Sequence, residues 1–243
     1  MLTPARLHAS LIALGYGWSK TQPNLIGIRT ALNVPNVFND VFVSVWTQPQ
    51  MPNGLTLAEQ QAFLNAFYYA GKNGLALKVD GSPGTNTNFA IEQYKATVGT
   101  ERLQARAITT VPGAFYLINP LKGGCAVLVP GQYKNAYILG FHQNNQSHPA
   151  LVQRGGEVRI YRDNDHDNKP EETATAESGY FGINIHRTGD KRISTQIDNW
   201  SAGCQVGPDK AKHDQMLAFC EQYRTSSGNK YTYTLLRERE LLA

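Results

Sequence analysis

The apolar residues of the chain follow two spacings, and each spacing predicts a kind of element. Short runs of alternating or continuous apolar residues, bounded by glycine, proline and asparagine, predict strands. Runs with apolar residues three and four positions apart predict helices. The predicted strands are 25–28, 41–46, 115–118, 125–129, 137–141, 158–161, 180–186 and 231–235. The predicted helices are 4–14, 56–70, 85–97 and 209–224.

The segment after the second predicted strand is helical and differs from the rest of the chain. Thr56-Leu-Ala-Glu59 is typical of a capping box, and Asp80-Gly-Ser-Pro-Gly84 of a tight turn between two helices. The strands before and after this segment have the pattern of one β-rich body. We therefore expect an α+β fold with a discontinuous domain, residues 1–50 and 107–243, and an inserted helical unit at 54–106.

Composition and charge narrow the functional classes. The chain has 243 residues, of which 41% are hydrophobic and 17% charged, which is enough apolar material for a core. Its 23 basic and 19 acidic residues give a net charge of +4 without any basic run, which argues against nucleic-acid binding and suits an anionic polymer. No apolar stretch approaches the ~18–20 residues of a membrane span, so none is expected.

Three cysteines raise the question of which thiol is chemically active. An odd number at wide spacing fits neither a disulfide framework nor a zinc pattern. Cys125 falls in an apolar predicted strand and Cys220 on the apolar face of a predicted helix, which favours core positions for both. Cys204 follows small and polar residues, Trp200-Ser-Ala-Gly, and is the candidate nucleophile.

His186 ends a predicted strand and is the candidate base for Cys204. A cysteine attacks a carbonyl as its thiolate, so it needs a neighbouring group that takes its proton. Imidazole does this near neutral pH. Gly203 would let successive backbone N–H groups face a developing oxyanion. An activated Cys204 would then be alkylated well below pH ~8.5, the usual thiol pKa.

His186, fourteen intervening residues and Ser-Ala-Gly-Cys204 together resemble the signature of the L,D-transpeptidases of the YkuD type. That signature is His, a spacer, then Ser/Thr-His-Gly-Cys, and the resemblance covers about residues 110–210. It implies a β-rich catalytic body, Cys204 as nucleophile, His186 as general base, and an oxyanion hole lined by the backbone amides around the cysteine. The catalytic residues implied are Cys204, His186, Ser201, Ala202 and Gly203.

Two positions depart from the family pattern, because Ala202 replaces its His and Val206 its usual basic or amide residue. These departures motivate an alternative from another class, a non-catalytic peptidoglycan-binding protein with a degenerate transpeptidase fold. Candidate substrate-binding residues flank the catalytic ones. Tyr180 and Trp200 either shape an acyl pocket or simply pack, and Arg187 either binds a stem-peptide carboxylate through a bidentate pair or faces water.

A second resemblance concerns the helical unit. The run Asp80-Gly81-x-x-Gly84-x-x-Thr87-x-x-Ala90-Ile91-x-x-Tyr94 is similar to the core motif of the peptidoglycan-binding type 1 module. The resemblance implies that Asp80, Gly81 and Gly84 belong to a wall-binding site. Pro83 and Lys95 stand where the module has an aromatic residue and a glutamine.

Other patterns offer weaker alternatives. Asp163-Asn-Asp-His-Asp-Asn168 has the alternating acids of a calcium loop, but Ala174 stands where the bidentate Glu belongs, so a solvated turn is favoured. His142 and His148 lack the His-x6-Asp and His-x-His spacing of zinc wall peptidases, so we expect no metal and no cofactor. Cys125 would suit a papain-like peptidase only at a helix start, and its surroundings predict a strand.

The combined patterns predict a cysteine-dependent enzyme acting on peptidoglycan stem peptides, by L,D-transpeptidase, carboxypeptidase or endopeptidase chemistry. Its expected partner is bacterial peptidoglycan, in the periplasm or at the cell wall. No signal peptide is evident, which suggests synthesis in the cytoplasm and delivery, as a phage lysis factor or an injected effector with a delivery system or an immunity protein. The group orienting His186 is left open between a backbone carbonyl, Asp190 and Asp198.

Overall fold

Two β-sheets organise the α+β fold of a computed structural model that describes residues 1–30, 36–173, 175–189 and 192–242. The strands are β1 (Asn24–Arg29), β2 (Asp40–Thr47), β3 (Glu101–Ile108), β4 (Cys125–Leu128), β5 (Gly131–Phe141), β6 (Pro149–Gln153), β7 (Val158–Asp163), β8 (Ala176–Gly179), β9 (Ile185–Arg187), β10 (Gln205–Gly207) and β11 (Tyr231–Arg237). The helices are α1 (Pro4–Ala13), α2 (Leu57–Ala66), α3 (Thr85–Lys95), α4 (Ala114–Ile118), α5 (Lys210–Glu221) and α6 (Arg224–Ser227).

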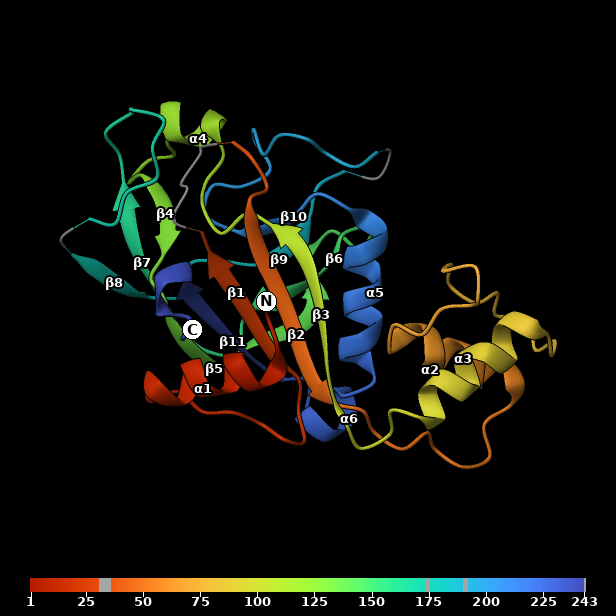
Figure 1. The fold of residues 1–243 in the computed structure, drawn as a ribbon. Coiled ribbons are helices and arrows are strands. Elements are labelled where there is room, and N and C mark those ends of the chain that lie inside the picture. The colour runs from red at the N-terminus through yellow and green to blue at the C-terminus, as the bar shows by residue number, and fades with distance from the viewer. Residues whose placement is uncertain (31–35, 174, 190–191, 243) are drawn as a thin grey trace.

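The larger sheet has the order β10-β9-β6-β5-β11-β1-β2-β3, and β4-β7-β8 form the smaller one. The strands β1 and β2 of the larger sheet are buried along most of their length. Because successive residues of a strand point to opposite faces, both faces of the sheet are covered there. Phe42 and Trp46 join a core with α5, whereas Val43 and Val45 join a second core with α1. Figure 1 shows these two helices beside the sheet. The continuous apolar pattern at 41–46 is thus a strand packed on two sides. No helix of the described residues is long and apolar enough to cross a bilayer.

The helices α2 and α3 belong to an excursion between two paired strands. Strands β2 and β3 pair antiparallel from Asp40 opposite Ile108 to Thr47 opposite Glu101, so residues 48–100 leave the sheet and return at the same edge. Figure 1 shows the excursion projecting beyond α5. The expected boundary at 106/107 falls inside β3, and residues 101–106 belong to the sheet.

Aromatic side chains connect the excursion to the main body. The ring of Phe67, at the end of α2, lies 5.7 Å from that of Phe219 on α5 and 6.5 Å from that of Trp46 on β2. Within the excursion, the predicted capping box between Thr56 and Glu59 is formed. The unit therefore shares one hydrophobic core with the sheet, although its chain is inserted.

Most predicted elements are formed, and the exceptions have local causes. The predicted helices correspond to α1, α2, α3 and α5, each shorter than expected at its end. The predicted strand 115–118 is instead the helix α4, which begins after Gly113. The predicted strand 180–186 contains strand only at β9, because the backbone N–H groups of Phe181, Gly182 and Ile183 all donate to Oε1 of Gln153. This loop curves around a glutamine side chain rather than pairing with a neighbouring strand.

Candidate functional site

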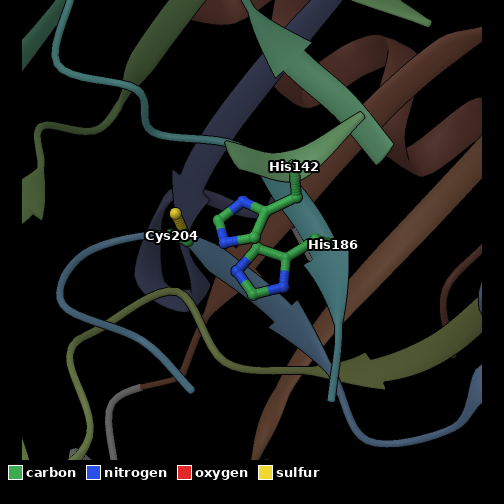
Figure 2. A group of neighbouring side chains, drawn as sticks. All are labelled: His142, His186 and Cys204. Carbon is green, nitrogen blue, oxygen red and sulfur yellow. The ribbon is translucent and has the colours of Figure 1, made fainter. Parts of the chain in front are cut away.

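The sheet brings His142, His186 and Cys204 to one point (Figure 2). His142 directly follows β5, His186 lies in β9, and Cys204 immediately precedes β10, which pairs parallel with β9. One nitrogen of each imidazole and the cysteine sulfur lie within 4.8 Å of one another. The predicted nucleophile and base are therefore close together, and a second imidazole accompanies them.

The turn before Cys204 explains the Ser-x-Gly-Cys pattern. The Ser201 hydroxyl is buried, accepts the N–H of Gly203 at 3.1 Å and donates to the carbonyl of Cys204 at 2.8 Å. Gly203 has φ of 143°, and a Cβ there would lie 2.5 Å from the carbonyl oxygen of Ala126, so only glycine fits. Ser201 fixes the turn, and the Gly203 amide, expected in the oxyanion hole, is already occupied by this hydroxyl.

The tautomer of His186 is set by a backbone carbonyl. Its Nδ1 donates to the carbonyl oxygen of Arg187 at 2.8 Å, which leaves Nε2 unprotonated. This Nε2 is buried and has no hydrogen-bond partner among the described residues. Of the other groups expected to orient the ring, Asp198 is exposed and accepts from Asn36, and Asp190 lies outside the described residues.

The imidazoles are held neutral. Burial, and next the neighbouring His142, keep the pKa of His186 well below its usual range. Burial and the nearby His148 lower the pKa of His142 to about 4. The His142 and His186 rings stack with centroids 3.9 Å apart, and the His148 ring lies 5.2 Å from each. Uncharged imidazoles are proton acceptors, which is the state a base requires.

Cys204 is half-buried and is a neutral thiol at rest. Burial raises the pKa of Cys204 to about 11, although the N–H of Asn184 donates to the sulfur and opposes this rise. The thiol lies 3.4 Å from the carbonyl oxygen of Gly182, to which it donates. This raised pKa disagrees with the expectation of a thiol ionised well below pH ~8.5.

Cys204 lies in a cleft of about 480 Å³ that carries positive charge. Among the described residues that line it there are three cations and no carboxylate. One of the cations, Arg162, pairs with Glu177 at 2.6 Å. The others, Lys122 and Arg154, come from the segment before β4 and from the end of β6. A separate hollow of about 450 Å³ near Trp18 is lined by neither cysteine nor histidine in this part of the chain.

The expected substrate-binding residues lie elsewhere. Arg187 is only 3% exposed, donates to the carbonyls of Thr188 and Ser147, and is not among the described residues that line the cleft. Tyr180 and Trp200 are exposed, and neither is among the described residues lining the cleft. The structure thus does not place these three residues in the lining of the described cleft, whose aromatic residue is Phe181, and their substrate-binding roles stay predictions.

Two of the expected wall-binding residues of the helical unit, Asp80 and Gly81, form hydrogen bonds with the side chain of Gln61. Oε1 of the buried Gln61 accepts the N–H groups of Asp80 and Gly81, and its Nε2 donates to the Asp80 carboxylate. Gly84 is the N-cap of α3. Asp80 and Gly81 thus stabilise the turn, and none of the three lines the Cys204 cleft in the described structure.

The structure adds no support for the alternative nucleophile Cys125 or for a calcium loop. Cys125 is buried in β4, and burial raises its pKa to about 12, as it does for the buried Cys220. Asp165, Asp167 and Glu171 form an exposed acidic group, and Ala174 lies outside the described residues.

The sequence offered His142 and His148 only as rejected zinc ligands, and it did not reveal that both imidazoles lie beside His186. Both follow from strand order, since β6 lies between β5 and β9, and no spacing in the sequence reveals that order. A buried acceptor nitrogen, a thiol and a cationic cleft together can support nucleophilic attack on a carbonyl. Comparisons with protein-family models, curated proteins and solved structures gave no match for this chain.

Proposed function

We propose that this protein is a cysteine-dependent enzyme that acts on the stem peptides of bacterial peptidoglycan, at the cell wall or in the periplasm. The observation that carries this proposal is a buried imidazole beside a thiol: one nitrogen of His186 lies within 4.8 Å of the Cys204 sulfur, and Nε2 of this ring is buried and unpartnered among the described residues. The resemblance of the His186 to Cys204 segment to the L,D-transpeptidase signature adds the substrate class. The mixed fold, with a large sheet and helices, is compatible with it.

The proposed reaction begins with proton transfer from Cys204 to Nε2 of His186. The sulfur attacks the carbonyl carbon of the stem's diamino-acid residue, and the imidazolium then protonates the leaving D-amino acid. The thioester is passed to an amine, giving transfer, or to water, giving hydrolysis. With the Gly203 amide occupied, the amides of Ala202 and Cys204 are the donors we assign to the oxyanion.

The charge of the cleft supports an anionic substrate. Lys122 and Arg154 line it without an opposing carboxylate among the described lining residues, and stem peptides carry free carboxylates. In this proposal these two residues take the role expected of Arg187. The helical unit would hold the enzyme on the wall and raise its local concentration at the substrate.

A second candidate is a wall-binding protein without catalysis. The observation in its favour is the raised pKa of Cys204, about 11, which leaves the thiol protonated at neutral pH. Ala202 and Val206, where the family pattern has other residues, point the same way.

Mass spectrometry of purified muropeptides and intact sacculi after incubation separates the two candidates. The enzyme proposal expects loss or exchange of a terminal D-amino acid, or a new cross-linked dimer. Cys204→Ala and His186→Gln should abolish these products. Cys125→Ala, which removes a buried thiol outside the cluster, should still form them. Circular dichroism confirms that each variant folds. Identical products from wild type and Cys204→Ala, with both proteins pelleting with sacculi, would leave the wall-binding function.

A further inference from the structure

His142 forms part of the site without a role in the proposed reaction. Its ring stacks on that of His186 at 3.9 Å between centroids and 21° between planes. Figure 2 shows the two rings side by side, each with a nitrogen on the side of Cys204. Two stacked imidazoles beside one thiol raise the question of which nitrogen carries a proton on each ring.

A short chain of hydrogen bonds fixes the tautomer of His142. The backbone N–H of Gln153 donates to Oδ1 of Asn184 at 2.9 Å, which determines the orientation of that amide. Nδ2 of Asn184 then faces Nδ1 of His142 at 3.1 Å. Because an amide NH₂ only donates, Nδ1 of His142 must accept, and the proton of the neutral ring lies on Nε2.

The two rings therefore have opposite tautomers. On His186 the Arg187 carbonyl holds the proton on Nδ1, and on His142 the Asn184 amide holds it on Nε2. One nitrogen of each ring lies within 4.8 Å of the Cys204 sulfur, and because Nδ1 of both rings is already hydrogen-bonded, Nε2 is the nitrogen of each that is left for the sulfur. Nε2 of His186 is then an acceptor and Nε2 of His142 a donor. We propose that His142 is a second catalytic residue of this site, whose Nε2–H donates a hydrogen bond to the Cys204 thiolate as it forms.

The proton transfer balances without any further reactant. The S–H bond of Cys204 breaks, the sulfur keeps the electron pair, and an N–H bond forms at Nε2 of His186. His142 retains its own proton and stabilises the negative sulfur, as the N–H of Asn184 does from the backbone. The imidazolium and thiolate then lie side by side in a half-buried site, where a hydrogen bond to a charged group is stronger than it is in water.

The same three residues have the spacing of a metal site, and the tautomer of His142 argues against that use. Coordination through Nε2 would move the proton to Nδ1, where it would meet the N–H of Asn184. The Asn184 amide cannot turn over without opposing the N–H of Gln153. A hydrogen-bond donor is the role that leaves every partner satisfied.

The donor is tested by alkylation of the free protein. Iodoacetamide rates at Cys204 are measured from pH 7 to 9.5 by mass spectrometry of the Cys204 peptide. His142→Phe keeps the ring and removes the donor, and we expect a rate about tenfold lower at each pH. His142→Gln retains an N–H near the Nε2 position and should stay within about twofold of wild type. Gln143→Gly, a cleft neighbour at φ of 50°, is the matched control and should also stay within about twofold.

The tautomer is tested on the wild-type protein, so the proposal does not depend on a variant that folds. Two-bond ¹H–¹⁵N spectra should show His142 protonated at Nε2 and His186 at Nδ1. A His142 ring protonated at Nδ1, or a His142→Phe rate equal to wild type, overturns the proposal. Saturable heat on titrating Zn²⁺ into wild type, lost in His142→Phe, overturns it in favour of a metal site.

This inference rests on the proposed function for its catalytic meaning, and its experiment needs no peptidoglycan. If the muropeptides are unchanged while His142→Phe slows alkylation, the enzyme proposal fails and the hydrogen bond stands. If wild type processes muropeptides while His142→Phe alkylates normally, the reverse holds.

Discussion

Cys204 and His186 show how burial determines the protonation state of a single atom. Burial raises the pKa of its thiol to about 11 and holds the pKa of His186 well below its usual range. Both shifts favour the neutral pair, so in the proposed reaction charge separation would occur only as the sulfur attacks. The spacing in the sequence identifies both residues, and it does not reveal this resting state because burial depends on the fold.

The raised thiol pKa predicts the pH dependence of alkylation. A folded-state pKa above the usual ~8.5 leaves little thiolate at pH 7, so the iodoacetamide rate at Cys204 should rise about tenfold per pH unit from pH 7 to 9.5. Free cysteine under the same conditions should level off above pH ~8.5. A plateau for Cys204 below that pH would mean that the site ionises the thiol at rest.

At the scale of elements, the apolar pattern predicts the strands and helices that form the cores, and it does not predict the edge strand of the larger sheet. The strands β1, β2 and β11 and the helices α1 and α5 contribute to the cores and are predicted from their apolar residues. The strand β3 lies at a sheet edge and contains Glu101, Arg102 and Arg106, so its apolar signal is weak. His142 enters the site through the order of β5, β6 and β9, which is a property of tertiary pairing rather than of any local run.

The turn before β10 predicts a position-specific cost. Gly203→Ala would place a Cβ 2.5 Å from the Ala126 carbonyl oxygen at a φ of 143°, so we expect at least about 1–3 kcal/mol of lost stability and a displaced Cys204. Gly207→Ala, whose Cβ would meet nothing nearer than 3.9 Å, is the control and should be close to neutral. Urea unfolding measures both. Equal stability of the two variants would contradict the close approach.

For the whole molecule, buried neutral histidines connect folding to pH. Burial is the main cause that lowers the pKa of His142 to about 4 and of His213 to about 3, and it also lowers that of His186. Below pH ~6.5 these histidines bind protons in the unfolded chain, whereas in the folded chain they stay neutral until a lower pH. The folded state is therefore destabilised as the pH falls.

The expected size of this acid effect is large. Between pH 6.5 and 5 a buried histidine shifted as far as His213 removes up to about 2 kcal/mol from the free energy of unfolding. Urea unfolding at pH 7, 6 and 5 should show a steady loss, and His213→Gln should have a shallower pH dependence than wild type. A free energy of unfolding unchanged from pH 7 to 5 would show that these rings are protonated or exposed in the folded protein.

The excursion between β2 and β3 makes part of the chain exchangeable in evolution. Its two ends are already neighbours, because Gln48 and Thr100, and Gly99 and Gln48, are joined by backbone hydrogen bonds. The length of what lies between them therefore adds little closure entropy. A different unit could be grafted there without shifting the sheet register. Such a graft would have to provide an aromatic surface that packs on both Phe219 and Trp46, a demand on shape rather than on sequence.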